Sequence, residues 1–180
     1  KWAFVNNLAH NNFKGFMMDL DQYTQSTLDV IQSAQTLALG RGHQRFQPAH
    51  ILYALIGEKS GTINRLLEQL HINPHEIKSA VENELSKIPV VEGSGADQVY
   101  LAPQTAKLYE TSQTAAKKYG DHFVAVERLF QGLFDLSDTP IQNIFKQFKL
   151  SPQTWEQAIQ TLRQGRKVNS KNAEEQYASL

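Results

Sequence analysis

The feature that most constrains the fold of this chain is an internal repeat. Residues 31–85 align without a gap on a second copy that lies 78 positions further along, as from Gln35 to Gln113. Further identical pairs are Thr36 and Thr114, Ala38 and Ala116, Gly42 and Gly120, Leu55 and Leu133, Gln69 and Gln147, Pro74 and Pro152, and Ala80 and Ala158. A repeat of such long period predicts two copies of one supersecondary unit. Because much of the sequence is explained by the packing of the two copies, the repeat favours a catalytic role less.

Each copy has the pattern of four helices. In the first copy, apolar residues at helical spacing predict helices over 21–39, from Pro48 to a stop at Gly57, over 63–70, and from Pro74 through Leu85. The prolines fit the first turn of a helix and the glycines fit helix ends. In the second copy the expected ranges are 104–119, 125–135, 139–148 and 152–164. The fold class is therefore all-α: a pseudo-duplicated pair of four-helix repeats (21–88 and 104–164), joined by a Gly/Pro-containing linker (89–103).

Composition narrows the classes of function. The chain has 180 residues, of which 41% are hydrophobic, and this suits one compact domain or two small halves with a shared core. Lys and Arg number 18 and Asp and Glu number 18, and no basic stripe is present, so nucleic acid is not an expected partner. No apolar run approaches the roughly 20 residues that span a bilayer, so no membrane partner is expected either. The absence of cysteine excludes disulfides and fits a reducing compartment.

The two ends of the chain depart from the repeat. Residues 1–17 lack its periodicity, and we expect them to be a non-native or disordered extension outside the fold. Residues 165–172, GRKVNSKN, are polar without an apolar period and indicate a linker. After them, Asn172 and Glu175 have the spacing of a helix start.

Signals for chemistry are weak. The glycine pairs at 40–42 and 93–95 follow neither the spacing of a phosphate-binding loop nor a predicted strand, and cap or turn roles explain them. His71 and His75 have i, i+4 spacing, but Pro74 starts a helix between them and no third ligand matches. No serine has the setting of a nucleophile elbow. We therefore expect neither a metal site nor a catalytic site.

The linker holds apolar residues outside any predicted helix, namely Val90, Val91, Val99, Tyr100 and Leu101. One interpretation is that they pack into the seam between the two repeats. The other is that some of them line an open groove for apolar peptide segments, because exposed apolar patches commonly mark partner sites. The sequence leaves both open.

Three stretches make the chain resemble a known family: IQSAQTLALGRGHQRFQPAHILYAL, the linker start IPVVEGSG, and AAKKYGDHFVAVERLF. They are similar to the N-terminal domains of Clp-type AAA+ chaperones, and most of all to those of the bacterial ClpB disaggregases. The resemblance covers about residues 18–180. It implies a Clp N-terminal domain over 18–164, followed at 165–180 by a linker toward an ATPase domain.

The resemblance also implies a function. The parent protein would be a cytoplasmic hexameric ATPase that threads aggregated polypeptides through a central pore together with the DnaK chaperone system. This segment would recruit unfolded or aggregated polypeptides and would itself be monomeric. ATP and magnesium would belong to the ATPase domains, so we expect no cofactor and no ATP hydrolysis in this segment.

By the same resemblance, a surface groove beside the first helix and the linker engages substrate. Thr24 and Glu127 match family positions tied to that surface, and its apolar lining would be Leu28, Val99, Tyr100 and Leu101. The alternative function is an adaptor-docking N-domain of a Clp protease unfoldase, with a folded partner and tighter binding. A third possibility is a structural helical repeat without a chaperone role.

Overall fold

The computed structural model describes residues 19–93 and 99–180. The extension expected at residues 1–17 lies outside the described residues. Among the described helices, none combines the length and the apolar character that a membrane span requires.

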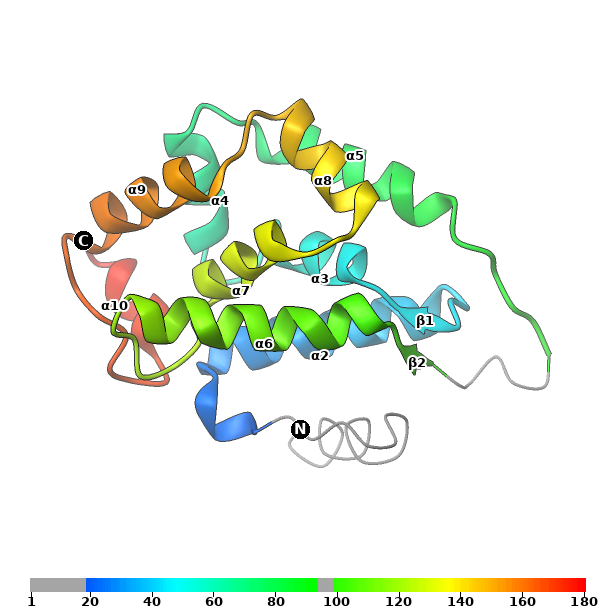
Figure 1. Cartoon of the computed structure of the whole chain (residues 1–180), viewed down its shortest axis with the longest axis horizontal. Coiled ribbons are helices and arrows are strands. Elements are labelled where there is room, and N and C mark those ends of the chain that lie inside the picture. Colours follow the sequence, from blue (N-terminus) through cyan, green and yellow to red (C-terminus); the bar gives the residue numbers. More distant parts are fainter. Residues whose placement is uncertain (1–18, 94–98) are drawn as a thin grey trace.

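The described part of the first repeat follows the predicted order of helices (Figure 1). A short 3-10 turn, η1 (Leu20–Gln22), precedes it. The repeat then consists of α2 (Gln25–Gly40), the two-residue strand β1 (Arg45–Phe46), α3 (Pro48–Leu55), α4 (Thr62–Gln69) and α5 (Pro74–Ser86).

The helices of the second repeat follow the same order, 78 positions later. It consists of the strand β2 (Tyr100–Leu101), α6 (Pro103–Lys118), α7 (Val126–Gly132), the 3-10 turn η2 (Leu133–Asp135), α8 (Thr139–Gln147) and α9 (Pro152–Arg163). A short helix, α10 (Ala173–Tyr177), follows. The helix expected over 125–135 is therefore divided into α7 and η2. The all-α, duplicated fold class is confirmed.

Side-chain caps determine where several helices begin. Asn73 accepts a hydrogen bond from the backbone N–H of His75, and Ser151 accepts one from that of Thr154. The first long helix starts at Gln25 rather than at residue 21, because the hydroxyl of Thr24 accepts the backbone N–H of Thr27 at 3.2 Å and caps the helix there. Thr24 is thus a helix cap and not part of a helical face.

The two repeats exchange backbone pairing. Phe46 of the first repeat pairs in parallel with Leu101, which precedes the second repeat. Val124 of the second repeat forms an isolated parallel bridge with Tyr23, which precedes the first. A shift of 78 positions takes Phe46 to Val124 and Tyr23 to Leu101, so each pair is the counterpart of the other in the repeat. The domain therefore has an approximate internal twofold relation.

The long helices α2 and α6 run in opposite directions. Tyr23, before the start of α2, accepts a hydrogen bond from Gln113 in the last part of α6 at 2.9 Å. Thr105, in the first turn of α6, donates to the backbone carbonyl of Phe46, beyond the end of α2, at 2.7 Å. Each helix has 16 residues, which corresponds to about 24 Å at 1.5 Å per residue. The starts of the two helices therefore lie at opposite ends of the domain.

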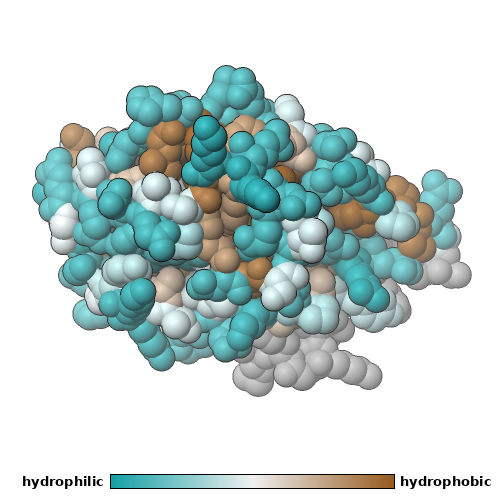
Figure 2. Space-filling model, turned by 45° about the horizontal axis from the view of Figure 1, so that its top comes forward, coloured by the Kyte–Doolittle hydropathy of each residue, from teal (hydrophilic) through white to brown (hydrophobic). Residues whose placement is uncertain are grey.

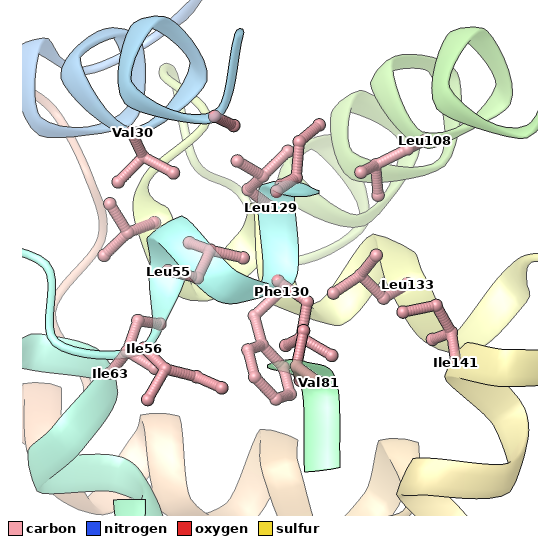
Figure 3. Close-up of a cluster of buried hydrophobic side chains, with 14 of the residues drawn as sticks. Val30, Leu55, Ile56, Ile63, Val81, Leu108, Leu129, Phe130, Leu133 and Ile141 are labelled. Atoms are coloured by element: carbon pink, nitrogen blue, oxygen red, sulfur yellow. The ribbon is translucent and has the colours of Figure 1, made fainter. Parts of the chain in front are cut away.

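One apolar core joins the repeats. Figure 3 shows Leu55, Ile56 and Ile63 of the first repeat facing Leu129 and Phe130 of the second. Phe130 lies near the centre and stacks on the Trp155 ring with 3.9 Å between the ring centroids. Since an amphipathic helix needs a partner for its apolar face, each repeat supplies the surface that buries the other.

The C-terminal residues are not a free linker. Val168, Ala173 and Tyr177 are buried in a small apolar cluster with Ala125 of the second repeat. We call residues 168–177 the C-terminal strap. The helix start expected near Asn172 is confirmed by α10, but the polar stretch before it packs on the domain. Whether an ATPase domain follows stays a prediction.

Equivalent core positions in the two repeats provide a test of the shared core. Leu66 on α4 and Ile144 on α8 occupy matching positions and are both buried. Each change to alanine should lower the free energy of unfolding by about 2–5 kcal/mol, because it leaves a cavity. Urea denaturation measures this loss. The matched control is Gln69→Ala on the exposed side of α4, and equal small effects for all three variants would contradict a shared core.

Candidate functional site

The structure divides the predicted site residues between the two ends of the domain. Thr24 and Glu127 lie at the end where α2 and α7 begin, and Val99, Tyr100 and Leu101 lie at the end where α6 begins. These ends carry α10 and β2, which lie far apart in Figure 1. The predicted residues therefore do not form one groove.

Leu28 belongs to the interior. Its side chain is buried in the core cluster, on the side of α2 that packs on the rest of the domain. It is not a lining residue of an open surface.

The linker lies along the segment that leads into β1. The backbone N–H of Val91 donates to the carbonyl of Gly42 at 2.9 Å, and that of Tyr100 donates to the carbonyl of Gln44 at 2.7 Å. Gly42 has a φ of +69°, and a Cβ there would lie 3.1 Å from a Val90 methyl carbon. A glycine is therefore required both for the backbone turn and for the close approach of the linker.

Side chains alternate between buried and exposed where the linker enters β2. Val99 is buried and Tyr100 is 54% exposed, as expected for successive residues of a strand. Val90 is 61% exposed, and Val91 and Leu101 are half-buried. Val99 therefore fits the first interpretation, since it packs into the shared core, whereas Tyr100 faces solvent. That the exposed residues receive apolar peptide segments stays a prediction.

These residues form an apolar patch on the surface. We call Val90, Val91, Tyr100 and Leu101 the linker edge. Among the described residues, three large hydrophobic side chains are exposed, those of Val90, Tyr100 and Leu180, and two of these three are on the linker edge. Figure 2 shows apolar surface at the right-hand end of the molecule, beside the grey atoms.

The opposite end holds a buried charged cluster. Arg163, at the end of α9, donates to Glu127 at 2.7 and 2.9 Å and to Asp121 at 2.9 and 3.0 Å. Burial alone would lower the pKa of Arg163, but Glu127 and Asp121 outweigh burial and raise it. The guanidinium group is therefore held charged in the interior by two carboxylates.

A second arginine extends this cluster. Arg128 donates to Asp121 at 2.8 Å, to Gln131 at 2.6 Å, and to Glu156. Its guanidinium also lies 4.3 Å from the centroid of the Tyr119 ring. Asp121 is shared between Arg128 and Arg163, so α7 and α9 are joined through one carboxylate.

The C-terminal strap closes this end of the domain. Glu174 accepts a hydrogen bond from the hydroxyl of Thr24 at 2.5 Å and from the backbone N–H of Val126 at 3.1 Å. Burial, and then the nearby Glu127, raise the pKa of Glu174 to about 7. Thr24 and Glu127 are 0% exposed. Two residues expected on an open surface are therefore covered in this structure, because the strap lies over them.

Sequence reasoning missed the charged members of this cluster other than Glu127. One signal was available, because Asp121 and Arg128 stand 78 positions after His43 and His50. The two histidines are also buried and hydrogen-bonded, with 2.8 Å between His43 Nδ1 and His50 Nε2. Both repeats therefore carry a buried, hydrogen-bonded polar pair at the same two positions.

The histidine pair has one consistent proton arrangement. The backbone N–H of Gln47 donates to His50 Nδ1 at 3.0 Å, so the neutral ring carries its proton on Nε2 and donates it to His43. Burial, and then the neighbouring His43, lower the pKa of His50 to about 4. The pair is therefore held neutral in the folded domain.

The carboxylates at the charged end are already engaged by donors within the domain. The carboxylates Asp121, Glu127 and Glu174 are buried and bonded to arginine or to backbone and hydroxyl donors. Within residues 19–93 and 99–180, no group of three or more His, Asp or Glu side chains is placed to hold a metal ion. The open feature of the site is the apolar linker edge.

Residues 22–148 match the family model described as the Clp repeat (R) N-terminal domain. The chain belongs to this family. This Clp N-terminal domain is 41% identical over 163 residues to the chaperone protein ClpB of Rhodopseudomonas palustris, with 91% of this chain and 18% of the relative covered. It thus spans less than a fifth of the length of that relative. The predicted resemblance to ClpB N-terminal domains is confirmed.

Solved structures support the fold of this Clp N-terminal domain. The N-terminal domain of Hsp104 from Candida albicans matches with a TM-score of 0.74 at 22% identity, over 85% of this chain and 99% of that one. A ClpV N-domain, solved in complex with a VipB peptide, matches with a TM-score of 0.65 at 11% identity, over 83% of this chain and 94% of that one. At such identities the likeness concerns the fold alone.

The buried charged cluster predicts a large effect of removing one partner. Arg163→Ala should lower the free energy of unfolding of this Clp N-terminal domain by about 3–5 kcal/mol, because Glu127 would stay buried without its counter-charge and Asp121 would keep only Arg128. Chemical denaturation measures the change. Arg166→Ala is the control, since Arg166 is exposed three residues later; similar effects of the two changes would contradict the structural role of the cluster.

The histidine pair predicts a pH dependence. The pKa of His50 is about 4 in the folded domain and about 6.5 when unfolded, so the unfolded chain binds more protons between these values. The free energy of unfolding should therefore fall by about 2–3 kcal/mol as the pH drops from about 6.5 to about 4. In His50→Gln this decrease should be smaller, and in His75→Gln, at an exposed position, it should persist. A parallel pH profile for all three proteins would contradict the assignment.

Proposed function

We propose that this Clp N-terminal domain recruits unfolded or aggregated polypeptides by binding their apolar segments at the linker edge. The observation that carries the proposal is the exposure of Val90 and Tyr100 beside β1 and β2. Among the described residues, Leu180 is the one other large hydrophobic side chain that is exposed. Exposed apolar patches of this kind commonly mark interaction sites.

The chemistry of the linker edge suits clients of many sequences. Unfolded chains expose apolar segments, and apolar contact depends on buried area and not on particular donors and acceptors. Covering about 100 Å² of apolar surface on the domain contributes about 2.5 kcal/mol, and the ordering of a flexible client offsets part of this gain. Binding should therefore be weak and tolerant of sequence, as a protein that handles many clients requires.

The backbone of β2 provides a second element of recognition. The N–H groups of Tyr100 and Ala102 donate toward β1. Because backbone groups alternate in direction along a strand, the N–H of Leu101 between them points to the other side. An extended client segment can add to this edge as a further strand, with its apolar side chains beside Val90 and Tyr100.

The parent protein of this proposal is a hexameric AAA+ disaggregase of the cytoplasm. Its ATPase domains would bind ATP and magnesium, and it would thread recruited polypeptides through a central pore together with the DnaK system. The ClpB similarity supports this, although the present chain covers 18% of that relative. The family match here is to an N-terminal domain alone, so ATP hydrolysis would reside in other domains.

A second candidate is the docking of a folded adaptor. The ClpV N-domain solved with a VipB peptide shows that a domain of this fold is found with a peptide partner. In the present domain, a cavity of about 530 Å³ lies between α2 and the turn after α3, and the residues that line it include the charged side chains Asp29, Glu58 and Lys59. A cavity with charged lining fits a specific partner better than a variable apolar client.

The test removes the exposed apolar side chains of the linker edge. Val90→Ser with Tyr100→Ser should weaken binding to a chemically unfolded model protein by about tenfold or more, since it removes a large share of the apolar contact. The free energy of unfolding should change by no more than about 1 kcal/mol, because both side chains are mainly exposed. Fluorescence anisotropy of the labelled client measures the binding.

The matched control is Leu180→Ser. Leu180 is also an exposed apolar residue, at 43% exposure, but it lies outside the linker edge. Equal client binding by the double variant, the control and the unchanged domain would contradict the proposal. Loss of binding to one folded partner through changes at Asp29 or Lys59, without any binding of unfolded chains, would favour adaptor docking.

A further inference from the structure

The C-terminal strap makes polar contacts with the body of the domain through its backbone and through its side chains. Two of its backbone carbonyls accept amides of the body, with 2.9 Å from Gln25 N to Lys171 O and 2.9 Å from His122 N to Val168 O. Its carboxylate Glu174 is held by Thr24 and by the N–H of Val126. The strap is thus bound both along its backbone and through one buried acid.

The apolar contacts of the strap are separate from the main core. Val168, Ala173 and Tyr177 form a cluster with Ala125, and the large cluster shared by the two repeats includes none of these residues. Small satellite clusters of this kind can open while the main core stays folded. Detachment of the strap would therefore leave the two repeats intact.

We propose that the C-terminal strap is a releasable cover over the polar end of the domain, which hides Thr24 and Glu127 when Glu174 is docked and exposes them when the strap detaches. The cover lies at the opposite end from the linker edge. It does not depend on client binding there.

In the docked state, some contacts of the strap stabilise it and some buried polar atoms destabilise it. Glu127 Oε2, Glu174 Oε2 and Tyr177 Oη are buried without a hydrogen-bond partner among the described residues. Each such atom costs free energy that water would recover on opening. Apolar burial and the backbone hydrogen bonds hold the strap, and these unsatisfied atoms favour its release.

The charge balance of the cluster also favours release of the strap. Four carboxylates, those of Asp121, Glu127, Glu156 and Glu174, surround two guanidinium groups, those of Arg128 and Arg163. When Glu174 is ionised, the cluster has an excess of negative charge in a buried place. Protonation of Glu174 removes one of these charges.

Protonation should therefore favour the closed strap. The groups that face Glu174 are Thr24 before α2, Val126 and Glu127 of α7, and, through Glu127 and Tyr177, Arg163 of α9 and Asp121. The pKa of Glu174 is about 7 when docked and 4.5 when exposed, so the closed form binds more protons between these values. As the pH rises from about 4.5 to about 7, the closed form loses stability relative to the open form, and above about 7 the loss is complete.

Amide hydrogen exchange in the full chain, without a client, tests this proposal. The amides of Gln25 and His122 donate to carbonyls of the strap, so their protection reports closure. The amide of Ala102 donates to the carbonyl of Phe46 at the other end and serves as the internal reference. Relative to Ala102, the protection factors of Gln25 and His122 should fall by about tenfold or more between pH 5 and pH 8.

Matched variants isolate the buried acid. Glu174→Gln keeps the shape and removes the charge, so the protection of Gln25 and His122 should lose its pH dependence. Glu175→Gln makes the same change at the exposed neighbouring position and should keep the profile of the unchanged chain. Protection equal to that of Ala102 at every pH would overturn the proposal, as it would make the strap a permanent part of the fold. An unchanged pH profile in a folded Glu174→Gln variant would also overturn the proposal. If that variant does not fold, the pH dependence of protection in the unchanged chain is the test.

Discussion

The burial of each repeat against the other is the interaction on which the structure depends. Four short helices with one apolar face each cannot enclose a core, so the first repeat needs the second to remove Leu55 and Ile63 from water. Phe130 and Trp155 stack where the two faces meet. The exchanged pairs, Phe46 with Leu101 and Tyr23 with Val124, then hold the ends of both repeats in register.

This internal symmetry creates two equivalent ends, and the two ends have diverged. Val90 follows the first repeat and is exposed, whereas Val168 follows the second at the matching position and is buried as the first residue of the C-terminal strap. The neutral pair His43 and His50 at one end corresponds to charged residues at the other. One scaffold thus carries an apolar, open edge and a charged, covered one. The proposed client site and the proposed releasable strap therefore lie at separate ends of one domain.

Much of the fold could be predicted from the sequence because packing periodicity is a local signal. The repeat, the order of helices and the proline and asparagine caps at Pro74 and Asn73 are all present in short stretches, and the structure confirms them. The start of the first long helix was misplaced, since residues 20–22 form a separate 3-10 turn and Thr24 caps the helix after it.

The candidate site was harder to predict because it depends on contacts between distant residues. Thr24 is covered by Glu174, 150 positions later, and the polar segment before α10 gives no local sign that it will be buried. The family resemblance led us to expect Glu127 and Tyr100 on one surface, but the antiparallel helices α2 and α6 put them at opposite ends. The exposure of Tyr100 depended on strand alternation, which a helical pattern does not reveal.

The most direct test of this account is an NMR titration of the whole chain with an unfolded, aggregation-prone model protein. The account predicts small, fast-exchange shifts at the amides of Val90, Val91, Tyr100 and Leu101, while those of Thr24 and Glu127 stay in place. Shifts centred on Thr24 and Glu127, or no shifts at all in a well-folded sample, would contradict the assignment of client binding to the linker edge.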